Sequence, residues 1–246
     1  AGEPDFDTPE HIKAATVAAL EAGFTKYTPS SGIPELRQAI AEKLQADNQL
    51  NYRASQIIVS NGAKHSCYNA ILATCQAGDE VVIPSPYWVS YPEQVRLVGA
   101  TAVLPETRED EGWLLSPDAL SKALTPKTKA VILCSPHNPA TTIVKREPLL
   151  AFLESLGSDP PLIVLDEAYA DFVDDPDFPQ GVSLLGGFPR LLVLRTFSKI
   201  AALAGMRLGY AIAQREIIQQ MRPFSTGTIS AIVKWGGVAA LKDTES

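Results

Sequence analysis

The residues of this chain best suited to chemistry are a lysine and the polar groups around it. Lys199 follows an apolar run that predicts a short buried strand, with Thr196 and Ser198 just before it and Arg207 eight residues after it. Burial among apolar neighbours disfavours the ammonium form of a lysine, and a neutral amine can form a Schiff base with a carbonyl group. Hydroxyls and a guanidinium are the donors that an anionic phosphate needs. A lysine that only extends its amine to water is the simpler alternative, and these residues alone leave both interpretations open.

Two carboxylates and a tyrosine follow another apolar run, the one at residues 162–165. Asp166 and Glu167 come directly after the run, and Tyr169 stands three residues beyond Asp166. A carboxylate buried at a strand end needs a cationic partner or several hydrogen bonds, so this position suggests a binding site. The alternative is a surface turn with a helix cap. Glu167 has no role in either interpretation.

Three more apolar runs lead into residues that could bind a ligand. One turns through Gly62 into a helix, whose free N–H groups and dipole favour an anion, although many such turns bind nothing. The next two lead to Trp88, which could stack on a flat ring or simply anchor a helix, and to Asn138, which could donate to a phenolate oxygen. Ligand sites in parallel α/β sheets lie outside the carboxyl ends of the strands. We therefore expect the five strand-end residues to gather there: Gly62, Trp88, Asn138, Asp166 and Lys199.

The elements that must position these residues alternate along the chain. Apolar, β-branched runs alternate with helical patterns, which predicts an α/β fold with a mostly parallel sheet. Thr8 is predicted to cap the first helix, with Pro9 at its first position, and Pro34 is predicted to begin the second helix.

Composition limits the class of protein. The chain has 246 residues, of which 46% are hydrophobic and 20% charged, and a formal net charge of −7. This balance is typical of a globular protein and argues against a nucleic-acid surface, and no apolar run reaches membrane-spanning length. The cysteines, Cys67, Cys75 and Cys134, are odd in number and lack metal-like spacing, and the histidines are scattered. We therefore expect a reduced, cytoplasmic setting and no metal.

The segment around the lysine resembles a known signature. Thr-Phe-Ser-Lys at 196–199, followed by Gly-x-Arg-x-Gly-Tyr at 205–210, is similar to the lysine motif of the class I/II aminotransferases, the fold-type I enzymes that use pyridoxal 5'-phosphate (PLP). Residues 2–105 most resemble the prokaryotic aspartate aminotransferases, and residues from about 140 onward the histidinol-phosphate aminotransferases. The resemblance implies a mostly parallel seven-stranded sheet in α/β/α layers. It also implies an N-terminal segment over 1–24 and a large PLP-binding domain over 25–246.

The resemblance assigns roles to the residues expected around the pyridine ring of PLP. Lys199 would hold PLP as a Schiff base and act as the general base, and Asp166 would pair with the pyridine nitrogen. Trp88 would stack on the ring, while Asn138 and Tyr169 would bond its 3'-oxygen. Lys199, Asp166 and Tyr169 are thus the expected catalytic residues.

The resemblance also assigns a phosphate site and a partner. The expected phosphate-binding residues are Gly62, Ala63, Lys64, Thr196, Ser198 and Arg207. Tyr27 would reach the phosphate of the other subunit, which implies a homodimer with a shared active site.

The activity implied is amino-group transfer between an aspartate-like or histidinol-phosphate-like L-amino acid and a 2-oxo acid. Two departures stand out. The family's glycines are replaced by Thr141 after Asn138 and by Ala202 after Lys199, and we expect the loop at Thr141 to be reshaped. Because the chain starts without Met and ends before the small C-terminal domain, we expect a fragment without the arginine that clamps the substrate carboxylate. The alternatives are a PLP-dependent carbon–sulfur lyase, or a truncated remnant that binds PLP without turnover.

Overall fold

The computed structural model describes residues 2–243, which form two compact units. Unit 1 contains the residues up to Ser66 together with those from Leu194 onward, and unit 2 contains Cys67–Val193. Among the described residues, no helix combines the length and apolar composition needed to cross a lipid bilayer.

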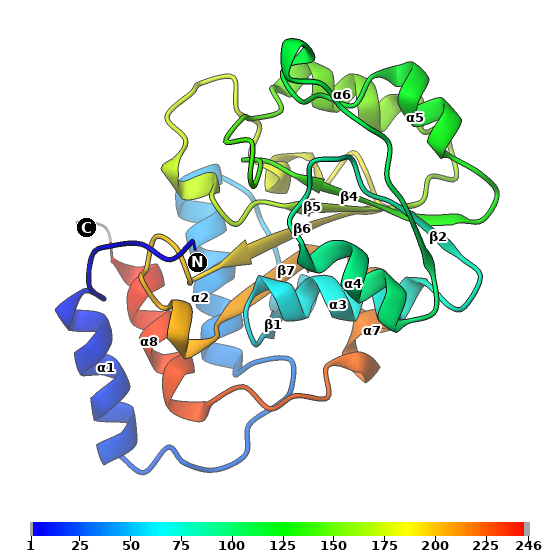
Figure 1. Cartoon of the computed structure of the whole chain (residues 1–246). Helices are drawn as coiled ribbons and strands as arrows, with labels where there is room; N and C mark the ends of the chain where they lie inside the picture. The colour runs from blue at the N-terminus through cyan, green and yellow to red at the C-terminus, as the bar shows by residue number, and fades with distance from the viewer. Residues whose placement is uncertain (1, 244–246) are drawn as a thin grey trace. The chain divides into compact units, whose positions relative to one another are not determined.

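Seven strands form one mixed sheet in the order β1-β7-β6-β5-β4-β2-β3 (Figure 1). Parallel pairing joins β2 to β3, β2 to β4 and β4 to β5, whereas β1 and β7 are antiparallel. Strand β6 (Leu191–Thr196) has all six residues buried and continues from unit 2 into unit 1. The predicted α/β fold with a mostly parallel seven-stranded sheet is confirmed.

Unit 2 is built on parallel strands, of which β5 ends in a carboxylate. Register pairing places Cys134, the last residue of β4, opposite Asp166, the last residue of β5, and all five residues of β5 are buried. Burial on both faces explains why β5 is a nearly continuous apolar run. The elements of this unit are β2 (Glu80–Val82), α4 (Ser90–Leu97), β3 (Thr101–Val103), α5 (Pro117–Ala123), β4 (Thr128–Cys134), α6 (Arg146–Ser155) and β5 (Leu162–Asp166).

Unit 1 combines both ends of the described chain. Its elements are α1 (Glu10–Glu21), α2 (Pro34–Asn48), β1 (Ile57–Ser60), β7 (Gly209–Ala213), α7 (Arg215–Met221) and α8 (Ala231–Lys242), and α3 (Ala63–Thr74) begins in this unit. Helix α8 packs against α1 and α2 (Figure 1). A Cβ at Gly236 would lie 2.4 Å from Thr16 Oγ1, and one at Gly237 would lie 2.5 Å from Leu208 Cδ2. The two helical glycines therefore permit this close packing.

The start of α1 differs from the prediction. The helix begins at Glu10 with Pro9 at its N-cap, and none of the described side chains caps it, so the predicted Thr8 cap is wrong. Thr8 Oγ1 instead donates to the Ala202 carbonyl oxygen, 2.8 Å away. The hydroxyl thus joins the N-terminal segment to the loop after Lys199, a long-range partner that capping rules do not consider.

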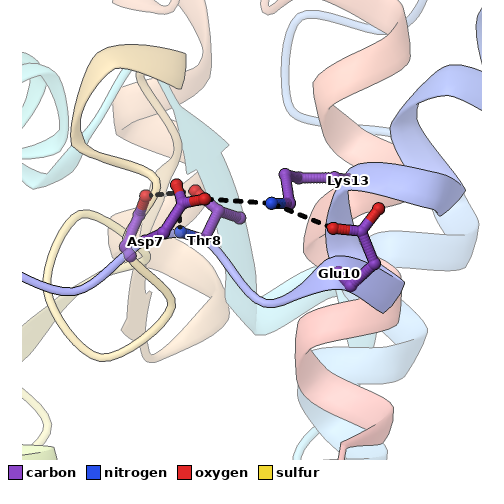
Figure 2. Close-up of polar contacts among 5 residues, drawn as sticks. Asp7, Thr8, Glu10 and Lys13 are labelled. Carbon is purple, nitrogen blue, oxygen red and sulfur yellow. Dashed lines mark hydrogen bonds and ion pairs between the residues drawn. The ribbon is translucent and has the colours of Figure 1, made fainter.

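An ion pair between Lys13 and Asp7 joins the same segment to the first turn of α1. Lys13 Nζ lies 3.0 Å from both Asp7 Oδ2 and Glu10 Oε2, as Figure 2 shows. Exposed ion pairs of this kind contribute little to stability. The Thr8 hydrogen bond is therefore the more specific contact of the N-terminal segment.

Candidate active site

The hydroxyls predicted to bind phosphate lie side by side at the end of β6. Thr196 and Ser198 are both buried, and their side-chain oxygens are 2.9 Å apart. Thr196 Oγ1 also accepts a hydrogen bond from the Ser198 N–H, and the Phe197 N–H donates to the Leu208 carbonyl at 3.1 Å. These bonds hold the residues before Lys199 next to those after Arg207.

Lys199 opens a tight turn directly after these hydroxyls. The Ala202 N–H donates to the Lys199 carbonyl at 3.0 Å, and Ala202 has a φ of 50°. The Lys199 amine donates to the carbonyl oxygen of Gly2. The Lys199 side chain as a whole is half-buried, but its amine is exposed and directed toward the N-terminal segment.

Gly62 and Arg207 are packed closely together in the candidate phosphate site. Gly62 has a φ of +84°, and a Cβ there would lie 2.5 Å from Arg207 Nη2. The guanidinium donates to the Ala204 carbonyl at 2.5 Å and reaches the Asn61 carbonyl at 3.5 Å. A glycine at this turn adopts the left-handed backbone without strain and leaves room for the guanidinium packed on it.

A second glycine brings β7 against the start of α3. A Cβ at Gly209 would lie 2.4 Å from the Ala63 nitrogen, so the turn at Gly62 and Ala63 lies against the residues after Arg207. Lys64, next in this first turn of α3, is exposed. Unit 1 thus gathers a helix N-terminus, a guanidinium and two hydroxyls, which are hydrogen-bond donors suited to a phosphate dianion.

The carboxylate predicted to face a cation lies in unit 2. Asp166 is 4% exposed. Its Oδ1 accepts a hydrogen bond from the Ala168 N–H at 3.1 Å, and its Oδ2 accepts one from the Tyr91 hydroxyl at 2.7 Å. Hydrogen bonds donated to a buried carboxylate favour its ionised form, so Asp166 is suited to hold a cationic ring nitrogen.

The predicted stacking residue lies beside the same tyrosine. The rings of Trp88 and Tyr91 meet edge to face, with centroids 5.3 Å apart and an interplanar angle of 83°. Trp88 itself is only half-buried. One side chain therefore contacts both the predicted ring-stacking residue and the predicted partner of the ring nitrogen.

Asn138 and Tyr169 line one pocket of unit 2. The pocket has a volume of about 500 Å³ and is also lined by His137, Thr141 and Phe172. The two residues predicted to bond the same cofactor oxygen are thus placed in a common pocket. Tyr27, by contrast, is 96% exposed on the loop between α1 and α2.

The aminotransferase class I and II family model matches residues 1–246. The chain belongs to this family. It is 44% identical to a bifunctional aspartate and glutamate/aspartate-prephenate aminotransferase of Petunia hybrida, over 98% of this chain and 51% of that protein. It is 42% identical to an aspartate/prephenate aminotransferase of Cereibacter sphaeroides, over 98% of this chain and 62% of that protein.

A solved aminotransferase structure agrees with the fold. Thermus thermophilus aspartate aminotransferase with maleate superposes with a TM-score of 0.91 at 39% identity, covering 98% of this chain and 64% of that one. The chain therefore spans between about half and two thirds of the length of these aminotransferases. The cofactor of the family is PLP, and the donor set of unit 1 fits its phosphate.

The two residues that replace glycines of the family both have a left-handed backbone. Thr141 has a φ of 59° and Ala202 a φ of 50°. The expectation that the loop is reshaped around Thr141 to avoid a positive φ is wrong, because the threonine itself adopts that conformation.

Sequence reasoning missed two residues of this region. Tyr91 stands three residues after Trp88. A tyrosine at this short spacing from the predicted ring-stacking residue was the sequence signal that could have indicated its role. Glu167, which had no predicted role, is 1% exposed and accepts a hydrogen bond from the Gly181 N–H at 2.5 Å. Its carboxylate fastens the loop after β5 and has a structural function.

Proposed function

We propose that this chain is the cofactor-binding part of a PLP-dependent aminotransferase, which moves an amino group between an L-amino acid and a 2-oxo acid. The observation that carries the proposal is the donor set of unit 1, in which Arg207 packs on Gly62 close to the turn of Lys199. Membership of the aminotransferase family supports the same reaction. The carbon–sulfur lyase alternative is not favoured, because the relatives named above are aminotransferases.

The phosphate group is proposed to bind in unit 1. The Thr196 and Ser198 hydroxyls, the Arg207 guanidinium, the backbone from Gly62 to Lys64 and the Lys64 side chain would donate to its oxygens. Tyr27 would reach the phosphate held by a second copy of the chain, which its 96% exposure allows.

The ring is proposed to be held by residues of unit 2. Asp166 would accept a hydrogen bond from the protonated ring nitrogen and so keep the ring cationic. Trp88 would pack on the ring face, and Asn138 and Tyr169 would donate to the 3'-oxygen.

Lys199 is proposed to carry the reaction. When bound, PLP supplies an electron sink that stabilises negative charge at the substrate Cα. Lys199 would bind the cofactor through its amine until a substrate replaces it. The freed amine would then act as the general base that takes the proton from the substrate Cα.

An aspartate-like amino acid is the proposed amino donor. The named relatives act on aspartate or prephenate according to their names, and they match both halves of this chain. The resemblance of residues 164–169 to histidinol-phosphate aminotransferases makes histidinol phosphate the second candidate.

The setting of the enzyme is also proposed. We place residues 1–24 in an N-terminal segment and 25–246 in the large domain, and we propose a cytoplasmic homodimer with shared active sites. Three free cysteines support a reducing compartment. Light scattering tests the dimer, and a strict monomer would remove the role given to Tyr27.

The visible absorption spectrum of the purified chain with PLP tests the proposed function. We expect the yellow band of a lysine-linked cofactor, and we expect L-aspartate or L-glutamate to bleach it to the amine form. Lys199→Ala should lose the band. A wild-type band that ignores every amino donor would contradict transamination, and no band at all would contradict the cofactor site.

A further inference from the structure

Tyr91 is placed to control the orientation of Asp166. It is the second residue of α4, is 1% exposed, and directs its hydroxyl to Asp166 Oδ2 at 2.7 Å. The Ala168 N–H holds the other oxygen, Oδ1. A carboxylate held at both oxygens has a restricted plane, so the Tyr91 hydroxyl and the Ala168 N–H together orient the Asp166 carboxylate.

Three groups close to Asp166 hold their protons more tightly than usual. Burial raises the pKa of Tyr91 and the pKa of Cys67 well above their usual values, and it raises the pKa of Cys134 to about 12. The nearby Asp166 carboxylate is the second cause of each increase. Tyr91 therefore stays a hydrogen-bond donor at physiological pH.

The same tyrosine also fixes the indole of Trp88. The edge-to-face contact, with ring centroids 5.3 Å apart, restricts the half-buried Trp88 ring. Such aromatic contacts add stabilising free energy beyond that of burying the rings. Tyr91 is thus joined to one residue by a hydrogen bond and to the other by ring packing, and the two contacts can be removed separately.

We infer that Tyr91 is the positioning residue of the candidate ring site, orienting Asp166 toward the cofactor's ring nitrogen and Trp88 toward its face. The inference rests on the proposed function, because both contacts are assigned to the ring of PLP. Tyr91 touches neither cofactor nor substrate in this assignment. It acts through Asp166 and Trp88.

A double-mutant cycle in the PLP dissociation constant tests the inference. Tyr91→Phe keeps the ring packed on Trp88 and removes only the hydroxyl, and Asp166→Asn removes the charge it orients. We expect Tyr91→Phe to weaken PLP binding roughly tenfold in the wild-type background, as for a hydrogen bond to a charged group. In the Asp166→Asn background the same change should weaken binding less than about twofold.

The spectrum of bound PLP and a matched control separate positioning from packing. The absorption maximum should move in Tyr91→Phe in the same direction as in Asp166→Asn, whereas loss of packing alone would lower only the melting temperature. Tyr68→Phe, which removes a hydroxyl from α3 in the same unit, should change neither binding nor spectrum.

The outcomes distinguish this inference from the proposed function. A wild-type chain that binds no PLP overturns the proposed function. A wild-type chain that binds PLP, with equal Tyr91→Phe effects in both backgrounds, overturns only the role of Tyr91. Should Tyr91→Phe not fold, NMR of ¹³Cζ-tyrosine replaces it: a tyrosine signal must move between the wild-type and Asp166→Asn holoproteins, and unmoved signals refute the inference.

Discussion

The two residues that replace glycines of the family have left-handed backbones. Thr141 follows Asn138, and Ala202 follows Lys199, with φ values of 59° and 50°. For an L-residue this conformation costs about 1–2 kcal/mol, and a β-branched side chain fits it worst. The Thr141 N–H donates to the His137 carbonyl at 2.9 Å, which helps to hold the threonine in this conformation.

Thr141→Gly is expected to stabilise the protein by about 0.5–1 kcal/mol. Removing the Cβ relieves strain in the folded chain. The free energy gained in this way is larger than the free energy lost because glycine makes the unfolded chain more flexible. The midpoint of urea unfolding measures the change. Thr142→Gly, the control at a neighbouring residue without positive φ, should destabilise, and an equal effect of both changes would refute the assignment of strain to Thr141.

The individual chemical groups were largely predictable, but their long-range partners were not. Lys199, Asp166 and Arg207 are marked by residue type and by the apolar runs before them. The Tyr91 bond to Asp166 spans 75 residues, and the Thr8 bond to Ala202 spans 194. Partners so far apart in the sequence produce no local sequence pattern, so these two hydrogen bonds are visible only in the folded chain.

At the scale of elements, one close approach holds the candidate phosphate site together. Strand β7 begins at Gly209, where its backbone lies against the turn that starts α3. The apolar runs predicted most strands well, because a buried parallel strand needs apolar residues on both faces. Strand β7 was not predicted, since its first residues were attributed to the lysine signature.

Gly209→Ala is expected to disrupt this approach. The new Cβ would lie 2.4 Å from the Ala63 nitrogen, and backbone atoms cannot move aside as a flexible side chain can. We expect a loss of about 1–3 kcal/mol in unfolding free energy, together with weaker PLP binding. Gly205→Ala, where nothing lies within 4 Å of the new Cβ, is the matched control and should leave both quantities near wild type.

At the scale of the whole molecule, one buried charge couples the stability of the fold to pH. Lys234 in α8 is 0% exposed, and its amine donates to the Thr28 hydroxyl. Burial lowers the pKa of Lys234 to about 8, from 10.5. Between these values the unfolded chain binds a proton that the folded chain does not, so this group makes stability rise with pH in that range. Below pH 8 both states are protonated, and the full cost of burying the ammonium remains.

Lys234→Met should therefore raise the melting temperature at pH 7, and its advantage over wild type should shrink as the pH increases toward 10. Comparing the two proteins cancels the thiols and phenols, which titrate in both. Lys242→Met removes the same charge from an exposed position of α8. The difference between its melting temperature and that of the wild type should not change with pH in this way. A gap that stays constant from pH 7 to pH 10 would mean that the Lys234 amine keeps its proton in the folded chain across this range.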